Sequence, residues 1–263
     1  CIRCNETIKF GLLLKKALAL GADALATGHY ARIEEGEDGY ILKKAVDERK
    51  DQSYVLYQLG QHELGALRFP LGSWTKTEVR RRAAELGLIT AAKPESQEIC
   101  FIAEGSYRTL LKARFADRVV PGSIVDESGV VVGEHEGIAM YTVGQRSGLQ
   151  LGPSARSSGA PMYVKSINPV SNTITVASNE GLLRDACTVE DVRYVSGRIP
   201  MGAFSAQVKV RSHAPAAEAQ VTPQRGWAEV RFQSSQRALA PGQAAVFYDD
   251  DRLIGGGPIA ASR

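Results

Sequence analysis

Two cysteines of this chain have surroundings that suggest chemistry. Cys100 lies in the short apolar run 99–102, which polar residues flank on both sides. This pattern predicts a short strand or strand end that carries the thiol out of a core. An inert core thiol is the alternative, because free cysteine is among the most buried residue types. Cys4 directly precedes a predicted helix, whose N-terminus would lower the pKa of the thiol and favour the reactive thiolate.

The other cysteines leave two further interpretations open. Cys1 and Cys4 have the Cys-x-x-Cys spacing of zinc sites and of redox pairs. A structural zinc site needs four ligands, whereas Cys100 and Cys187 are isolated and lie far along the chain. We therefore assign no metal site. We expect Cys187, which belongs to no motif, to be structural.

The composition is that of an ordinary globular protein. The chain has 263 residues, of which 44% are hydrophobic and 23% charged, enough for two or three small domains. A net charge of +3 does not by itself indicate a nucleic-acid partner. No apolar run approaches the ~20 residues that span a bilayer, and the first residues do not form a secretory signal. We expect a cytoplasmic protein without a membrane part, in which unpaired thiols persist.

The first part of the chain predicts an α/β domain that would position these thiols. Residues 8–20 have the periodicity of an amphipathic helix, with Ile8 and Leu12 on its apolar face. Residues 22–27 then predict a short buried strand that ends at the pair Gly28-His29. Ligands of α/β sheets collect beyond the carboxyl ends of strands, so this pair is a candidate binding position. A surface histidine at a turn is the alternative.

Three more elements are predicted before the cysteine run. Residues 31–33 and 40–42 predict a hairpin around an acidic turn, and residues 54–59 predict a helix. A second helix is predicted over residues 73–86, capped by Thr75 or Thr77. It carries three consecutive arginines, Arg80–Arg82, which are either a solvated face or a phosphate-binding track.

After residue 121 the pattern changes to short β-type runs between Gly, Pro and Ser. Strands are expected at 119–132, 140–143, 163–167, 173–177, 205–211, 228–232, 244–248 and 253–255. The last third predicts a small β-barrel or sandwich. The domains that we expect are 1–115, the later part of an α/β domain; 116–165, a small β-rich central domain; and 166–263, a C-terminal β-barrel.

Six motifs in order resemble a known family. They are Cys4–Phe10, Ala26–Arg32, Lys50–Leu56, Ser96–Ile102, Thr142–Leu149 and Pro241–Tyr248. Together they resemble the bacterial tRNA-specific 2-thiouridylases over nearly the whole chain. The resemblance implies an ATP-pyrophosphatase-type, Rossmann-like α/β domain, then a central domain and a β-barrel.

The resemblance also implies a reaction. The family uses ATP, with Mg²⁺ expected, to adenylate the C2 oxygen of the wobble uridine of tRNA, and a cysteine persulfide then supplies sulfur. By resemblance, Cys100 carries the persulfide and Cys4 is the nucleophile that forms a disulfide with it. The two thiols must then lie on facing segments of one cleft. The sulfur comes from a donor protein, either a relay protein or a cysteine desulfurase.

The resemblance implies binding residues as well. Gly28 matches an ATP contact. The matches to tRNA contacts are His29, Lys50, Asp51, Gln52, Arg211, Ser212 and Gln243.

The chain departs from the family in one respect. The family's Ser-Gly-Gly-x-Asp-Ser phosphate loop does not occur in it, and Cys1 stands where some members have aspartate. We expect the missing part to lie upstream. The alternatives are a non-catalytic tRNA-binding module and a redox or zinc protein that uses Cys1 and Cys4. A thiolation enzyme acting at another tRNA position is a further alternative.

Overall fold

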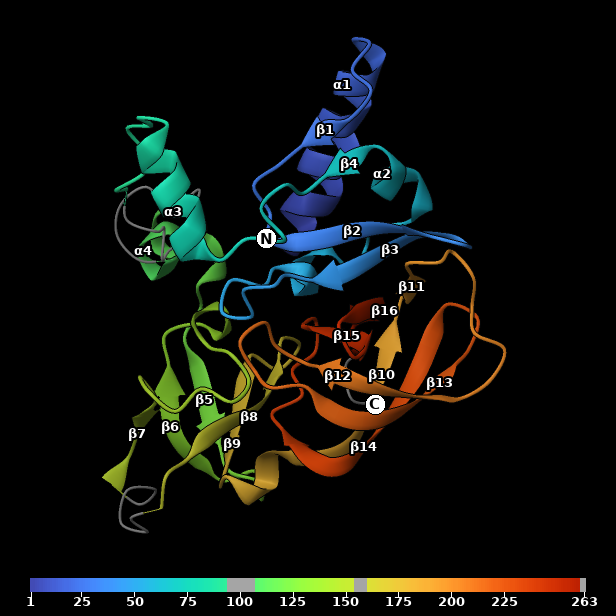
Figure 1. The fold of residues 1–263 in the computed structure, drawn as a ribbon. Coiled ribbons are helices and arrows are strands. Elements are labelled where there is room, and N and C mark those ends of the chain that lie inside the picture. The colour runs from blue at the N-terminus through green and yellow to red at the C-terminus, as the bar shows by residue number, and fades with distance from the viewer. Residues whose placement is uncertain (94–106, 154–159, 261–263) are drawn as a thin grey trace. The chain divides into compact units, whose positions relative to one another are not determined.

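The computed structural model describes residues 1–93, 107–153 and 160–260, and these form two compact units (Figure 1). The larger unit contains described residues of 1–93, 186–234 and 241–260. The smaller unit contains described residues of 107–185 and 235–240. None of the helices in the described ranges is both long and apolar enough to span a membrane.

The larger unit begins with a helix that is first π-helical and then α-helical. Segment η1 (Cys4–Leu13) is π-helical and continues into α1 (Leu14–Ala19). The wider turns change which side chains face the core, because hydrogen bonds join residues five apart. Phe10 and Leu14 are buried, whereas Ile8 is 55% and Leu12 70% exposed, so the predicted apolar face is wrong. Gly21, with φ +89°, follows the helix in the left-handed conformation that suits glycine.

A short parallel pair follows this helix. Strand β1 (Leu25–Ala26) pairs with β4 (Leu67–Arg68), which confirms a strand within the predicted range 22–27 but shortens it. Helix α2 (Gln61–Gly65) leads into β4. The predicted helix at 54–59 is instead the 3₁₀ turn η2 (Ser53–Leu56).

The predicted hairpin is confirmed as β2 (Ala31–Gly36) and β3 (Gly39–Lys44). It belongs to the same sheet as the C-terminal strands, because β3 pairs with β16 (Arg252–Pro258) at Lys43 and Arg252. The sheet order is β10-β14-β13-β12-β15-β16-β3-β2, with β11 beside β16 (Figure 1). The N-terminal segment and the C-terminal strands therefore belong to one compact unit.

The remaining strands of this sheet confirm the β-rich last third. They are β10 (Leu183–Glu190), β11 (Arg193–Tyr194), β12 (Phe204–Lys209), β13 (Ala217–Pro223), β14 (Trp227–Arg237) and β15 (Ala244–Asp249). One buried cluster spans both ends of the chain and includes Phe10, Leu42, Leu56, Leu64, Val246, Tyr248 and Leu253. Burial of this apolar surface holds the N-terminal segment against the barrel.

The predicted arginine-rich helix is α3 (Lys76–Glu85). Thr75 is its N-cap, because the amide of Glu78 donates to the Thr75 hydroxyl over 3.3 Å. The Glu78 carboxylate accepts from the Thr75 amide over 2.7 Å, which completes a capping box. No residue of α3 is buried.

The smaller unit is a sheet with short helices. Its sheet has the order β7-β6-β5-β9-β8, with β5 and β9 parallel. The strands are β5 (Gly122–Val125), β6 (Val131–His135), β7 (Gln150–Leu151), β8 (Tyr163–Asn168) and β9 (Thr173–Ala177). The helical elements are α4 (Tyr107–Arg114), η3 (Ala116–Arg118), η4 (Ile138–Met140) and η5 (Glu180–Leu182).

Three details of the smaller unit differ from expectation. The range 119–132, expected to be strand, instead contains β5, a turn and the start of β6, which pairs with β5. The strand expected at 140–143 is wrong, because η4 ends at Met140 and the following segment is irregular, with Met140 and Tyr141 packed into the core. Strand β8 runs across the predicted boundary between residues 165 and 166. The smaller unit therefore extends further along the chain than the central domain that we expected.

Candidate sulfur-transfer site

Cys4 lies inside the helix and not before it, which corrects the expectation from sequence. The amide of Asn5 donates to the carbonyl of Cys1 over 2.9 Å, so the turn around Cys4 is already helical. Asn5 is 2% exposed, and its side-chain amide donates to the carbonyl of Val55 over 3.2 Å. This bond joins the turn that carries the thiol to the segment η2. The Cys4 thiol itself is half-buried and unbonded to another cysteine of the described ranges.

His29, expected to contact tRNA, lies just after β1 and is 7% exposed, so the alternative of a surface histidine is wrong. Its Nδ1 lies 2.8 Å from the Thr27 hydroxyl, and its Nε2 lies 3.4 Å from the Lys9 ammonium. The rings of Phe10 and Phe69 pack against it, with centroids at 5.5 and 5.6 Å. Burial first, and the charge of Lys9 second, lower the pKa of His29 to about 4. The ring is therefore neutral at physiological pH.

The partners of His29 assign its tautomer. An ammonium can only donate, so Nε2 accepts from Lys9 and Nδ1 carries the proton that Thr27 accepts. A tRNA contact by His29 stays a prediction. In this structure both of its ring nitrogens face protein partners.

Lys9 was part of a motif in the sequence but was given no role there. It is half-buried, and among the described residues no carboxylate lies within 4.0 Å of its ammonium. Its position five residues after Cys4 places both on the π-helical segment η1. The sequence predicted an α-helix here, with hydrogen bonds between residues four apart, and so did not predict the π-helical turns of η1.

Gly28 is exposed and follows the parallel pair β1–β4 at its carboxyl end. This is the edge at which α/β sheets bind ligands. The donor set nearby fits an anionic group, because Lys9 offers a half-buried positive charge without an acidic partner in the described ranges. An added Cβ at Gly28 would make only ordinary contact, 3.7 Å from Leu71. The residues present are compatible with a nucleotide at this edge.

The segment expected to contact tRNA, Lys50–Gln52, is fixed by its own polar groups. The Asp51 carboxylate accepts from the amides of Ala45 and Ser53, at 3.0 and 3.2 Å, and from the Ser53 hydroxyl at 2.8 Å. The side-chain oxygen of Gln52 accepts from the backbone amide of Tyr30 at 3.0 Å. The backbone amide of Gln52 in turn donates to the carbonyl of Tyr30 at 2.8 Å. This loop is thereby joined to the segment that follows His29.

The expected tRNA contacts on the barrel lie in two loops. Arg211 and Ser212 are half-buried in a turn that the bond from the Ala214 amide to the Arg211 carbonyl closes at 3.2 Å. Gln243 directly precedes β15, and its side-chain oxygen is buried with no hydrogen-bond partner among the described residues. The larger unit thus contains every expected binding residue.

Cys100, the expected persulfide carrier, lies outside the described residues, as does the strand expected at 99–102. Its proximity to Cys4 stays a prediction. Cys187 is half-buried, and burial raises the pKa of its thiol to about 12. The described ranges contain no group of three or more side chains that could hold a metal ion, so they add no zinc ligands to Cys1 and Cys4.

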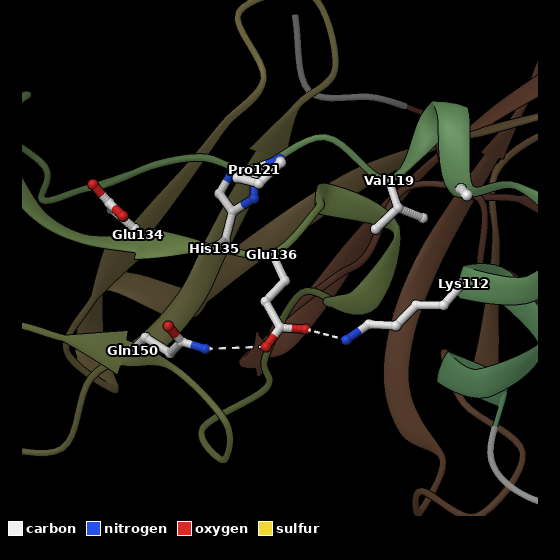
Figure 2. A pocket seen from close by; sticks show the side chains of 8 residues that line it. Lys112, Val119, Pro121, Glu134, His135, Glu136 and Gln150 are labelled. Atoms are coloured by element: carbon white, nitrogen blue, oxygen red, sulfur yellow. Dashed lines mark hydrogen bonds and ion pairs between the residues drawn. The ribbon is translucent and has the colours of Figure 1, made fainter.

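The smaller unit has an open hollow of about 480 Å³ between β6 and the helices that precede the sheet (Figure 2). Glu136, one of its lining residues, lies between Lys112 and Gln150 and accepts from them at 2.7 and 3.3 Å (Figure 2). The buried His135 lines it, with Nε2 3.0 Å from the carbonyl of Asn172. The lining contains no thiol, and its lysine is already neutralised by Glu136. This hollow therefore has no group suited to sulfur transfer.

Three family models place the chain in a class of tRNA-modifying proteins. Residues 1–104 match the tRNA methyl transferase HUP domain. Residues 108–178 match the tRNA methyl transferase PRC-barrel domain, and residues 184–259 match the aminomethyltransferase beta-barrel domain.

Curated relatives identify the family within this class. A tRNA-specific 2-thiouridylase of Herpetosiphon aurantiacus is 45% identical over all of this chain and 72% of its own length. One of Chloroflexus aurantiacus is 49% identical over 99% of this chain and 72% of its own length, and one of Clostridium botulinum is 42% identical over 98% and 72%. This chain belongs to the tRNA-specific 2-thiouridylase family. The descriptions of the family models refer to methyl transfer. The curated relatives, which are 42–49% identical to this chain across all three regions, are 2-thiouridylases, and we therefore assign the chain to the thiouridylases.

Proposed function

We propose that this protein catalyses ATP-dependent 2-thiolation of the wobble uridine of tRNA. The observation that carries the proposal is the 45% identity over the whole chain to a tRNA-specific 2-thiouridylase. The six sequence motifs, with Cys4 in the first and Cys100 in the fourth, support the same reaction.

The reaction requires both an activated carbon and a protected sulfur. The C2 carbonyl of uridine is a poor electrophile, and the adenylyl group that ATP supplies turns its oxygen into a leaving group. Gly28 and the edge of β1 would hold the nucleotide, with Mg²⁺ expected beside its phosphates. The terminal sulfur of a persulfide on Cys100 then bonds to C2 as the bond from C2 to oxygen breaks and AMP leaves.

We propose that Cys4 completes the transfer. Its thiolate attacks the inner sulfur of Cys100, the persulfide sulfur–sulfur bond breaks, and the electron pair stays with the sulfur on uridine. The products are 2-thiouridine and a disulfide between Cys4 and Cys100, which a thiol reductant must reduce before the next cycle. A donor protein, a relay protein or a cysteine desulfurase, supplies each new persulfide sulfur. The half-buried position of Cys4 suits a thiol that meets substrate and is shielded from bulk solvent.

The tRNA would bind across the larger unit. The predicted contacts are His29, Lys50, Asp51, Gln52, Arg211, Ser212 and Gln243. Their common location supports this proposal, because the hairpin β2–β3 and the barrel form one sheet. The buried oxygen of Gln243 could gain a hydrogen-bond donor from RNA. We place the reaction in the cytoplasm, where reduced thiols persist.

Mass spectrometry of tRNA nucleosides tests this function. In cells whose only copy of the gene encodes Cys100→Ser, we expect 2-thiouridine to be lost, whereas Cys187→Ser should retain it. Normal 2-thiouridine in the Cys100→Ser cells would remove the assignment. Binding of tRNA by the unaltered protein without any thiolation would indicate the alternative, a non-catalytic tRNA-binding module.

A further inference from the structure

Lys9 is a cation in an unusual setting. It is half-buried on η1, and no carboxylate of the described ranges lies within 4.0 Å of its ammonium. Its neighbour is the Nε2 atom of His29 at 3.4 Å. Partial removal of an ammonium from water costs free energy unless an anion compensates for it. The described part of the chain supplies a neutral acceptor instead, and no carboxylate of it forms an ion pair with this ammonium.

The surroundings of His29 keep its Nε2 atom a neutral acceptor for Lys9. The Lys9 ammonium selects the tautomer in which Nε2 is an acceptor, Thr27 accepts the proton on Nδ1, and the rings of Phe10 and Phe69 hold the imidazole in place. A protonated ring would repel Lys9 and could not accept from it. The histidine therefore orients the ammonium and occupies one of its three N–H donors, and no second acceptor for Lys9 occurs among the described residues, so two donors remain for another acceptor.

The position of this pair indicates what that acceptor is. His29 directly follows Gly28, which is exposed at the carboxyl end of the parallel pair β1–β4. Phosphates of nucleotides bind at such ends. Lys9, whose ammonium contacts His29, therefore brings a positive charge beside the residue that follows Gly28.

We propose that Lys9 is a phosphate-binding residue for the nucleotide, and that His29 is the positioning residue that aims it. This inference rests on the proposed function, because it takes ATP as the nucleotide. It assigns a role to Lys9 that neither its motif nor the family models specify. A phosphate oxygen would accept the two remaining N–H groups of Lys9 and neutralise its charge.

Nucleotide binding to the full-length protein tests the proposal directly. We would titrate the unaltered protein and three variants with a non-hydrolysable ATP analogue and Mg²⁺, in a calorimeter and without tRNA. Lys9→Met should weaken binding about 10- to 100-fold, the range expected for loss of a charge-assisted hydrogen bond. Lys9→Arg should lose less affinity than Lys9→Met. Lys15 is an exposed lysine on α1, and the matched control Lys15→Met should bind the analogue with unchanged affinity. Circular dichroism melts verify that each variant is folded.

Further measurements separate the other assignments. Unchanged affinity of folded Lys9→Met for the analogue would overturn the proposal. If that affinity were unchanged and the pH midpoint of Cys4 alkylation rose in Lys9→Met, Lys9 would instead stabilise the Cys4 thiolate. This result would also overturn the proposal. Unchanged nucleotide affinity with weakened tRNA binding would likewise overturn it in favour of an RNA phosphate. None of these results depends on the Cys100→Ser experiment, so failure of the proposed function is distinguishable.

Discussion

The hydroxyl of Ser53 lies 3.0 Å from the hydroxyl of Tyr248, although 195 residues separate them in sequence. Both side chains have 0% exposure. Ser53 also donates to Asp51, in the loop expected to contact tRNA. The contact therefore joins that loop to β15 of the barrel. We infer that the two parts would meet RNA as one preformed surface.

Loss of this contact should destabilise the larger unit. Tyr248→Phe removes a hydroxyl from a buried hydrogen-bonded group, which we expect to cost about 1–2 kcal/mol of unfolding free energy. Urea denaturation measures the change. Tyr163→Phe is the control, because that half-exposed ring packs under Arg237 in the smaller unit, and a change within about 0.5 kcal/mol is expected. Equal stability of Tyr248→Phe and the unaltered protein would show that the hydroxyl contributes nothing.

The buried His29 should make stability depend on pH. Its pKa falls from 6.5 to about 4 on folding, so between these values the unfolded chain binds a proton that the folded chain does not. Stability therefore decreases as pH falls from about 6.5 to 4, by up to about 3 kcal/mol, and does not depend on this group above that window. The charged neighbour in this setting is Lys9; Thr27 and the two phenylalanine rings are uncharged.

The variant His29→Phe isolates this effect. It keeps an aromatic ring between Phe10 and Phe69 and removes the titrating group. Denaturation at several pH values should give a flatter dependence for the variant than for the unaltered protein. Parallel curves over pH 4–6.5 would contradict the neutral, buried state of His29.

Cys187 should be chemically inert. Burial raises the pKa of its thiol to about 12, so almost no thiolate exists at pH 8. Iodoacetamide at pH 8 should modify the exposed Cys1 much faster than Cys187 in the native protein. Peptide mass spectrometry over a time course measures both rates. Equal rates for the two thiols would contradict this description of Cys187.

The arginine cluster on α3 offers a test of electrostatic binding. Arg81 and Arg82 share the single carboxylate of Glu85, and all three side chains are solvent-exposed, so the helix retains excess positive charge. Replacing both arginines by glutamate should weaken tRNA binding at low salt, and should reduce the slope of log affinity against log salt by about 1 per lost phosphate contact. Arg225→Glu, at an exposed turn of the barrel, is the comparison. Unchanged binding of the double variant would refute a phosphate track on α3.

Local signals in the sequence predicted much of the fold. The hairpin at 31–42 follows from alternating residues around an acidic turn, and the start of α3 follows from Thr75 with Glu78 three residues later. These features depend on residues close in sequence. The strand expected at 140–143 failed because Met140 and Tyr141 enter the core from a 3₁₀ turn, which tertiary packing and not periodicity decides.

Other features depend on contacts between distant residues. The pairing of β3 with β16 joins Lys43 to Arg252, and no local pattern specifies such a partner. The π-helical turns of η1 likewise place Phe10 in the core, whereas the predicted α-helix would have placed Ile8 and Leu12 there. Only the folded chain shows that His29 is buried beside Lys9. The identity of the thiols as a pair came from the family resemblance, and the site around Cys100 stays a prediction.

The most direct measurement traps the exchange between the two thiols. Full-length protein loaded with persulfide sulfur would be mixed with ATP, Mg²⁺ and tRNA for a single turnover, quenched with acid, and digested without reductant for mass spectrometry. We predict a peptide that links Cys4 to Cys100, formed in step with 2-thiouridine and absent from the Cys4→Ser variant. Full formation of 2-thiouridine by Cys4→Ser, with no linked peptide in the unaltered protein, would contradict the account.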